Sequence, residues 1–199
     1  MDNTRSVIII GKGASVQRCT KQYVDSFDEV AICGRPPYIG YEHLISNHAD
    51  WDFTNDSGLV KYSPELMHKL GLKWHVNTGG DSPIKKEFKY KTLDPSTGIL
   101  AFNFFAEIPE YTHIALVGFD LFQKNKRVYY FEFEDEHPSQ HYLWYNGTYD
   151  KEMTYLKESG HKTDLTYEFI TAQFKNYPDK KFSLITDYPF EKFDNVEMV

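Results

Sequence analysis

Short apolar runs and longer amphipathic stretches alternate along this chain, which is the hydrophobic rhythm of an α/β protein. Runs rich in β-branched residues predict strands, and on this basis we expect strands at 7–10, 29–33, 49–55, 72–77, 113–117 and 181–185. Helical spacing and helix-start signals predict helices at 15–26, 63–70, 99–108, 149–158 and 164–176. Because two early strands enclose a helix, the crossover between them should be parallel and right-handed. The sequence therefore predicts one α/β domain over 1–199, Rossmann-like, with a mostly parallel central sheet flanked by helices.

Two segments depart from this rhythm. Residues 121–148 contain a basic turn, an aromatic run, an acidic run and two histidines. A loop of this length on a compact domain usually carries function, so we expect an active-site region there. Residues 187–199 follow the last predicted strand without a clear pattern, and we expect them to form a loosely held C-terminal tail.

The charge and the cysteine content narrow the class of protein. The formal net charge is -7, which argues against a nucleic-acid partner. Two cysteines provide neither a disulfide framework nor a four-cysteine zinc site, as is usual in the reducing cytoplasm. No apolar run approaches the length that spans a bilayer, and the run after Arg5 is too short for a signal peptide. We therefore expect a cytoplasmic protein without a transmembrane segment.

The first predicted strand runs directly into the turn Gly11-Lys12-Gly13-Ala14-Ser15. Glycines allow a ligand to approach the main chain, and Ser15 can cap the helix that follows. The turn also fits an ordinary tight connection, since it lacks the third glycine of the dinucleotide fingerprint and the Lys-Ser pair of a P-loop. Gly34-Arg35 follows the second predicted strand, so in a parallel sheet both turns lie at the edge where ligands bind.

A second candidate site precedes the apolar segment 99–108. This segment is apolar nearly all round, which predicts a buried helix. Ser96 or Thr97 is expected to cap its start, where free N–H groups can bind an anion. A plain N-cap without a ligand is the simpler alternative.

Two further pairs of residues suggest other chemistry. Asp50-x-Asp52 resembles the Asp-x-Asp with which many glycosyltransferases hold a divalent cation, but alternating acids are also common on a half-exposed strand. His137 and His141 have the i, i+4 spacing of a metal pair, but Pro138 disfavours a helix there. Acid–base chemistry suits these two histidines better, with exposed loop residues as the alternative.

In their order and spacing, these segments resemble the sialyltransferases, particularly the short bacterial branch. The resemblance covers about residues 6–156 and rests on Gly11-Lys12-Gly13-Ala14-Ser15, Pro95-Ser96-Thr97-Gly98, Gly118-Phe119-Asp120 and His141-Tyr142. It implies inverting transfer of sialic acid or a related acidic sugar from a CMP-activated donor to a glycan hydroxyl. It also implies a metal-independent, GT-A-like variant of the nucleotide-sugar transferase fold.

The resemblance implies roles for individual residues as well. Those assigned to the nucleotide site are Gly11, Lys12, Gly13, Ser15, Gly34, Arg35, Asn55, Ser96, Thr97 and Gly98. Those assigned to the phosphate are Tyr129 and Tyr142. His141 is the expected catalytic base, with His137 and Tyr145 as the other catalytic candidates. The expected partners are the CMP-sugar donor and the glycan acceptor, with no metal or other cofactor. A homo-oligomer, and a position at the periphery of a membrane that carries the acceptor, are both compatible with this function.

The chain departs from the family pattern at several of these positions. Lys12 replaces an asparagine, Gly34-Arg35 replaces an Asn-Gln pair, and Tyr145 stands where the bacterial pattern has its basic histidine. Tyrosine, with an ordinary pKa of about 10, is a poor base at neutral pH. Two alternatives therefore stay open: a binding or scaffold protein that keeps the nucleotide site without transfer, and a metal-dependent glycosyltransferase that uses Asp50 and Asp52.

Overall fold

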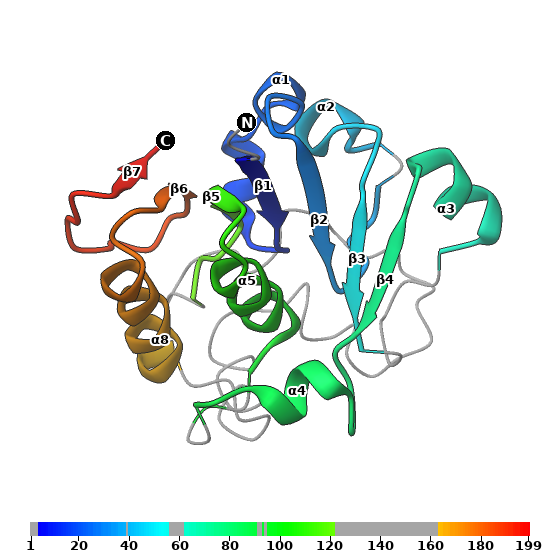
Figure 1. Cartoon of the computed structure of the whole chain (residues 1–199). Helices are drawn as coiled ribbons and strands as arrows, with labels where there is room; N and C mark the ends of the chain where they lie inside the picture. Colours follow the sequence, from blue (N-terminus) through cyan, green and yellow to red (C-terminus); the bar gives the residue numbers. More distant parts are fainter. Residues whose placement is uncertain (1–3, 39, 56–61, 91–92, 94, 122–162) are drawn as a thin grey trace, which may run out of the picture.

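The computed structural model describes residues 4–38, 40–55, 62–90, 93, 95–121 and 163–199 (Figure 1). Its centre is a seven-stranded sheet in the order β4-β3-β2-β1-β5-β6-β7. The strands are β1 (Arg5–Ile10), β2 (Glu29–Cys33), β3 (Trp51–Thr54), β4 (Trp74–Asn77), β5 (Tyr111–Val117), β6 (Lys181–Ile185) and β7 (Val196–Met198). Each neighbouring pair in this order is parallel. The predicted α/β domain with a Rossmann-like parallel sheet is confirmed.

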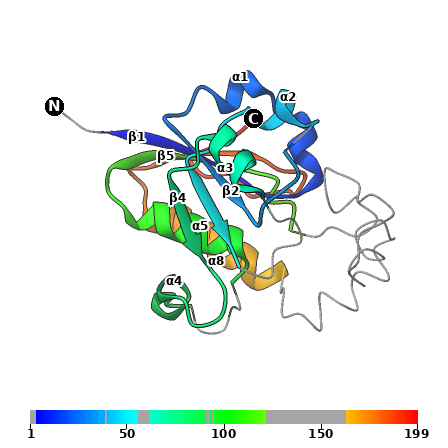
Figure 2. The ribbon, with the colours of Figure 1, turned by 90° about the vertical axis from the view of Figure 1, so that its right-hand side faces the viewer.

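Helices cover both faces of the sheet. They are the 3₁₀ helix η1 (Ala14–Arg18) and the α-helices α1 (Lys21–Val24), α2 (Glu42–Ile45), α3 (Pro64–Leu70), α4 (Pro83–Glu87), α5 (Thr97–Glu107) and α8 (Thr163–Asn176). Figure 2 shows α1, α2 and α3 on one side of the sheet and α4, α5 and α8 on the other. Alternate residues of β1 face the two layers: Val7 and Ile9 join the core with α5 and α8, while Ile8 and Ile10 join the core with α1 and α3.

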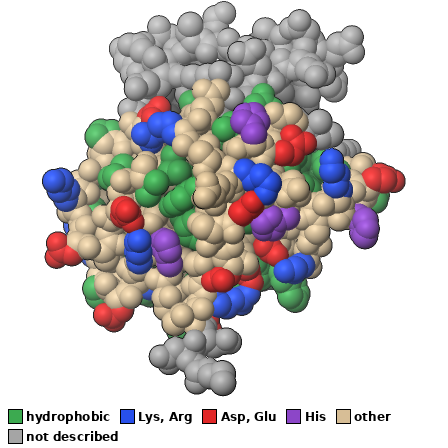
Figure 3. Space-filling view, turned by 90° about the horizontal axis from the view of Figure 1, so that it is seen from above, with side chains coloured by type: hydrophobic (Ala, Val, Ile, Leu, Met, Phe, Trp, Pro, Cys, Tyr) green, Lys and Arg blue, Asp and Glu red, His purple; other side chains and the backbone are tan. Residues whose placement is uncertain are grey.

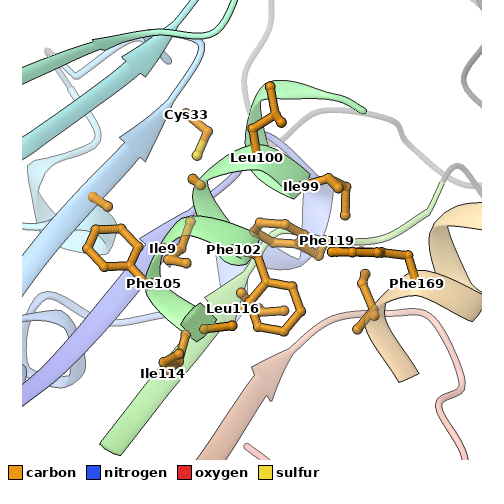
Figure 4. Packing of buried hydrophobic residues seen from close by; sticks show 14 of the residues in the cluster. Ile9, Cys33, Ile99, Leu100, Phe102, Phe105, Ile114, Leu116, Phe119 and Phe169 are labelled. Atoms are coloured by element: carbon orange, nitrogen blue, oxygen red, sulfur yellow. The ribbon is translucent and has the colours of Figure 1, made fainter. Parts of the chain in front are cut away.

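Helix α5 packs directly on the sheet. Figure 4 shows Phe102 and Phe105 of this helix among the apolar side chains of β1 and β5. The Phe102 ring also meets Phe169 of α8 edge-on, with ring centroids 6.3 Å apart. The prediction of a buried helix in this region is confirmed, and its first residue is Thr97.

The helix predicted at 15–26 is replaced by two short helices, η1 and α1. The backbone is extended at Thr20, with ψ of 149°, so η1 cannot continue through it. Thr20 Oγ1 then accepts a hydrogen bond from the Tyr23 N–H at 3.2 Å and acts as the N-cap of α1. A continuous helix was the wrong prediction because a threonine in this sequence begins a new helix.

The C-terminal segment is anchored to the domain, so the expectation of a loosely held tail at 187–199 is wrong. Its residues Val196–Met198 form β7 and pair with β6. Just before this strand, Asn195 Nδ2 donates to the carbonyl oxygens of Phe174 at 3.0 Å and Tyr177 at 3.1 Å. The Phe193 ring packs on Phe174 with ring centroids 5.4 Å apart. A three-residue edge strand is too short for the hydrophobic pattern to detect.

Charged side chains of both signs share the surface seen from above. Lys and Arg side chains are interspersed there with Asp, Glu and His side chains (Figure 3). Ion pairs of the described residues include Lys73 Nζ with Asp50 Oδ1 at 2.7 Å and Lys181 Nζ with Glu197 Oε2 at 2.8 Å. Within the described part of the chain, no helix has both the length and the apolar character needed to cross a bilayer.

Candidate functional site

The order of strands changes direction between β1 and β5. From β1 the chain adds β2, β3 and β4 on one side, and then crosses over to add β5, β6 and β7 on the other. In open parallel sheets, ligands bind at the carboxyl ends of the strands where this reversal occurs. The turns that follow β1 and β5 are therefore the first place to look for a functional site.

These two turns are packed against each other. The Gly11 N–H donates to the Val117 carbonyl at 2.7 Å, and the Gly13 N–H donates to the Gly118 carbonyl at 3.0 Å. A Cβ atom on Gly11 would stand 2.8 Å from the Gly118 oxygen, and one on Gly13 would stand 2.4 Å from Asp120 Oδ2. Both glycines are thus required by the close approach of the neighbouring turn, with or without a ligand.

Asp120 joins the ends of three strands. Its Oδ2 accepts a hydrogen bond from the Ser15 N–H at 2.8 Å, and its Oδ1 accepts one from the Asp187 N–H at 2.9 Å. The expectation that Ser15 caps the following helix is wrong: the N-cap of η1 is Gly13, and the buried Ser15 hydroxyl donates to the Ile185 carbonyl at 3.0 Å. Asp120 instead supplies the capping oxygen from the turn after β5.

Lys12 brings positive charge to the interior of this edge. Its Nζ lies 3.4 Å from the Gly34 carbonyl, so the side chain reaches from the turn after β1 to the end of β2. Gly34 has φ of +70°, and a Cβ atom there would stand 2.9 Å from this ammonium. Burial lowers the pKa of Lys12 to about 8, against an opposing effect of the Cys33 thiol.

Arg35, Asp52 and His75 form a cluster of ionisable side chains on the α1–α3 side of the sheet. Asp52 Oδ2 accepts a hydrogen bond from Arg35 Nε at 2.9 Å and lies 3.0 Å from His75 Nδ1. The Asp52 side chain is 1% exposed, and its other oxygen, Oδ1, has no hydrogen-bond partner among the described residues. The Arg35 guanidinium also stands 6.0 Å above the Tyr62 ring. This cluster was not predicted, because its members come from three different segments of the chain.

The Asp50-x-Asp52 pair does not converge on a common point. Asp50 lies just before β3, at the amino end of the sheet, whereas ligands of parallel sheets bind at the carboxyl ends. Its two oxygens bond the Lys73 ammonium at 2.7 Å and the Val30 N–H at 2.9 Å. Asp52 instead bonds Arg35 and His75. The interpretation of this pair as a shared metal site is therefore corrected: each carboxylate has its own protein partners.

The start of α5 adjoins the same sheet edge. Ser96, one of the two caps that the sequence left open, is the N-cap, and its hydroxyl accepts a hydrogen bond from the Ile99 N–H at 3.4 Å. The Thr97 hydroxyl lies 3.1 Å from that of Thr78, which follows β4. A Cβ atom on Gly98 would stand 3.0 Å from the Phe119 ring. The predicted nucleotide residues 96–98 thus contact the turns after β4 and β5.

The remaining predicted residues are only partly described. Asn55 is exposed after β3, and its Cβ atom lies 3.1 Å from where a Cβ atom of Gly79 would stand. Outside the described residues lie the predicted catalytic and phosphate-binding side chains His137, His141, Tyr145, Tyr129 and Tyr142. The predicted helix at 149–158 and the region 122–148 lie outside them as well.

Taken together, the predicted nucleotide residues gather along the carboxyl edge of the sheet, around the point where the strand order reverses. Two acids also belong to this edge: Asp120 ties the turns together, and Asp52 holds Arg35. The sequence placed both in motifs, Asp120 in Gly118-Phe119-Asp120 and Asp52 in Asp50-x-Asp52, but it predicted neither of these contacts. Comparisons of this chain with known protein families and with curated proteins found no match.

Proposed function

We propose that this protein is a glycosyltransferase that transfers sialic acid or a related acidic sugar from a CMP-activated donor to a glycan hydroxyl. The observation that carries the proposal is a contact between distant motifs. The Ser15 N–H bonds Asp120 Oδ2, although 105 residues separate them in the chain. Gly98 packs on Phe119, the neighbour of Asp120. Three of the motifs that resemble sialyltransferases therefore meet at one sheet edge.

The chemistry of this edge suits a nucleotide phosphate. Inverting transfer requires cations or N–H groups that stabilise the departing phosphate, and a base for the acceptor hydroxyl. Lys12 and Arg35 are cations at the ends of β1 and β2, and the first turn of α5 has N–H groups that a phosphate can accept from. In this proposal the donor and a glycan are the partners. The protein acts in the cytoplasm, or at a membrane that carries the acceptor.

Calorimetry tests the nucleotide part of the proposal. CMP, CDP and UDP are titrated into the protein with and without Mn²⁺, and we expect CMP to bind without the metal. The variant Lys12→Met should weaken CMP binding by about tenfold, because it removes one charged contact. Lys89→Met is the matched control, since Lys89 is 82% exposed and bridges to Glu107 instead. Failure of every cytidine nucleotide to bind would refute the proposal, and a strict need for Mn²⁺ would favour metal-dependent transfer.

A nucleotide-binding protein without transfer activity is the second candidate. The observation that favours it is Tyr145, which stands where the bacterial family has its base. Release of CMP from CMP-Neu5Ac separates the two functions. A transferase releases CMP and a binding protein only retains the donor, so the proposal fails if CMP binds and none is released.

A further inference from the structure

His75 and Asp52 have the geometry of an oriented proton acceptor. His75 lies on β4, and its Nδ1 is 3.0 Å from Oδ2 of Asp52. The carboxylate is 1% exposed while the histidine side chain is 47% exposed. A buried carboxylate that bonds one ring nitrogen fixes the tautomer and the orientation of the imidazole, and the other nitrogen is left to accept a proton.

Arg35 places a positive charge beside the Asp52–His75 pair. Its Nε donates to the same Asp52 oxygen at 2.9 Å, so a cation already balances the carboxylate. A histidine that acts as a proton acceptor does so in its neutral form. The second oxygen, Oδ1, is buried without a hydrogen-bond partner in the described residues. Such an orphaned oxygen is costly in a purely structural carboxylate, because a buried polar atom loses its water without gaining a bond.

The position of the pair connects it to the predicted donor edge. Ile10, Ile32, Asp52 and His75 are aligned partners on four adjacent parallel strands. His75 is therefore level with the last residue of β1, and the turn with Lys12 begins directly after that residue. Arg35, one of the predicted nucleotide residues, is bonded to the pair itself.

We infer that His75 is the proton acceptor for the incoming glycan hydroxyl, with Asp52 as the residue that positions it. This inference rests on the proposed transfer function. The hydroxyl proton passes to His75 Nε2, and an electron pair of the acceptor oxygen forms the new bond to the anomeric carbon of the sugar. The bond from that carbon to the phosphate oxygen breaks, and its electron pair stays on the departing CMP.

The test measures CMP release from CMP-Neu5Ac, with lactose or water as the acceptor. His75→Gln should lower kcat by about 100-fold or more and leave the KM for the donor within about twofold, as expected for lost general-base catalysis. His48→Gln is the matched control and should leave kcat unchanged. His48 is also partly exposed and near a carboxylate, at 3.7 Å from Asp25, but it precedes β3 at the amino end of the sheet.

A second measurement on the folded wild-type protein needs no activity. Nitrogen NMR of the His75 imidazole at neutral pH should find the proton on Nδ1 and none on Nε2, and Asp52→Asn should disturb this preference. A proton found on Nε2 would overturn the inference, whatever the activity. Unchanged kcat in His75→Gln would also overturn it, while the proposed transfer function would stand. A wild-type protein that releases no CMP would overturn both.

Discussion

At the scale of single residues, the positive charge of Lys12 lowers the stability of the folded protein. Its pKa in the folded protein is about 8, whereas an unfolded chain gives lysine its ordinary value of 10.5. The unfolded state therefore binds the proton more tightly, and holding the charged side chain in the folded state costs stability. This cost is fully present below about pH 8 and disappears as the pH rises to 10.5.

Replacing Lys12 with methionine should stabilise the protein at neutral pH. The shift in pKa sets an upper limit of about 3 kcal/mol on the gain, and solvent contact of the partly buried side chain reduces it to about 1–2 kcal/mol. Urea denaturation at pH 7 and at pH 9.5 measures the effect, which should be larger at pH 7. An equal gain at both values of pH would mean that packing, and not charge, is responsible.

Single residues also mark where sequence reasoning succeeded and where it failed. From the sequence, Gly11 and Gly13 belonged either to a turn that a ligand approaches or to an ordinary tight connection. The structure shows that a side chain at these two positions would meet Gly118 and Asp120, which lie more than a hundred residues further along the chain. A local pattern identifies a constrained backbone, whereas only the tertiary fold shows what constrains it.

At the scale of elements, Asp120 holds together the carboxyl ends of β1, β5 and β6. One oxygen bonds the Ser15 N–H and the other bonds the Asp187 N–H. An asparagine in its place has one acceptor oxygen and one NH₂ group, so one of the two N–H groups would face another donor.

We therefore expect Asp120→Asn to lower the free energy of unfolding by about 2–3 kcal/mol, as for a lost bond to a charged acceptor in a buried site. Chemical denaturation at pH 7 measures this loss. Asp187→Asn is the control: its exposed carboxylate pairs with Arg18 at 3.6 Å, and the substitution leaves its N–H unchanged. The control should change stability by less than about 1 kcal/mol. If both substitutions lower the free energy of unfolding equally, Asp120 does not hold these turns together.

Element boundaries followed from sequence wherever hydrophobic pattern or cap chemistry was strong. The strands at 29–33 and 181–185 and the cap at Ser96 agree with the structure. The helix at 15–26 did not, because Thr20 is both compatible with a helix interior and a good N-cap. Propensity alone does not decide between these two roles.

At the scale of the whole molecule, the sequence predicted a parallel sheet but not the order of its strands. That order places Asp52 beside both Arg35 and His75, although these residues lie in three separate segments. The sequence motif instead paired Asp52 with Asp50, which lies two residues earlier in the chain. The predicted nucleotide edge followed from the rule for parallel sheets, whereas the cluster on its α1–α3 side needed the assembled fold.

The last strand shows how the whole domain depends on a segment expected to be loose. Deletion of residues 193–199 removes β7, the packing of Phe193 on Phe174 and the two Asn195 hydrogen bonds, and it leaves β6 as an open edge. Burial of one aromatic side chain and two hydrogen bonds together stabilise a fold by about 3–4 kcal/mol. We expect the truncation to lower the free energy of unfolding by at least about 2 kcal/mol. We also expect the truncated protein to associate through the exposed edge, since unpaired strand edges promote pairing between chains.

Chemical denaturation measures the loss of stability, and gel filtration measures the association. Met198→Ala, at a half-exposed position of the same strand, should change stability by less than about 0.5 kcal/mol. A truncated chain as stable and as monomeric as the full one would mean that β7 contributes nothing, and the expectation of a loose tail would be restored.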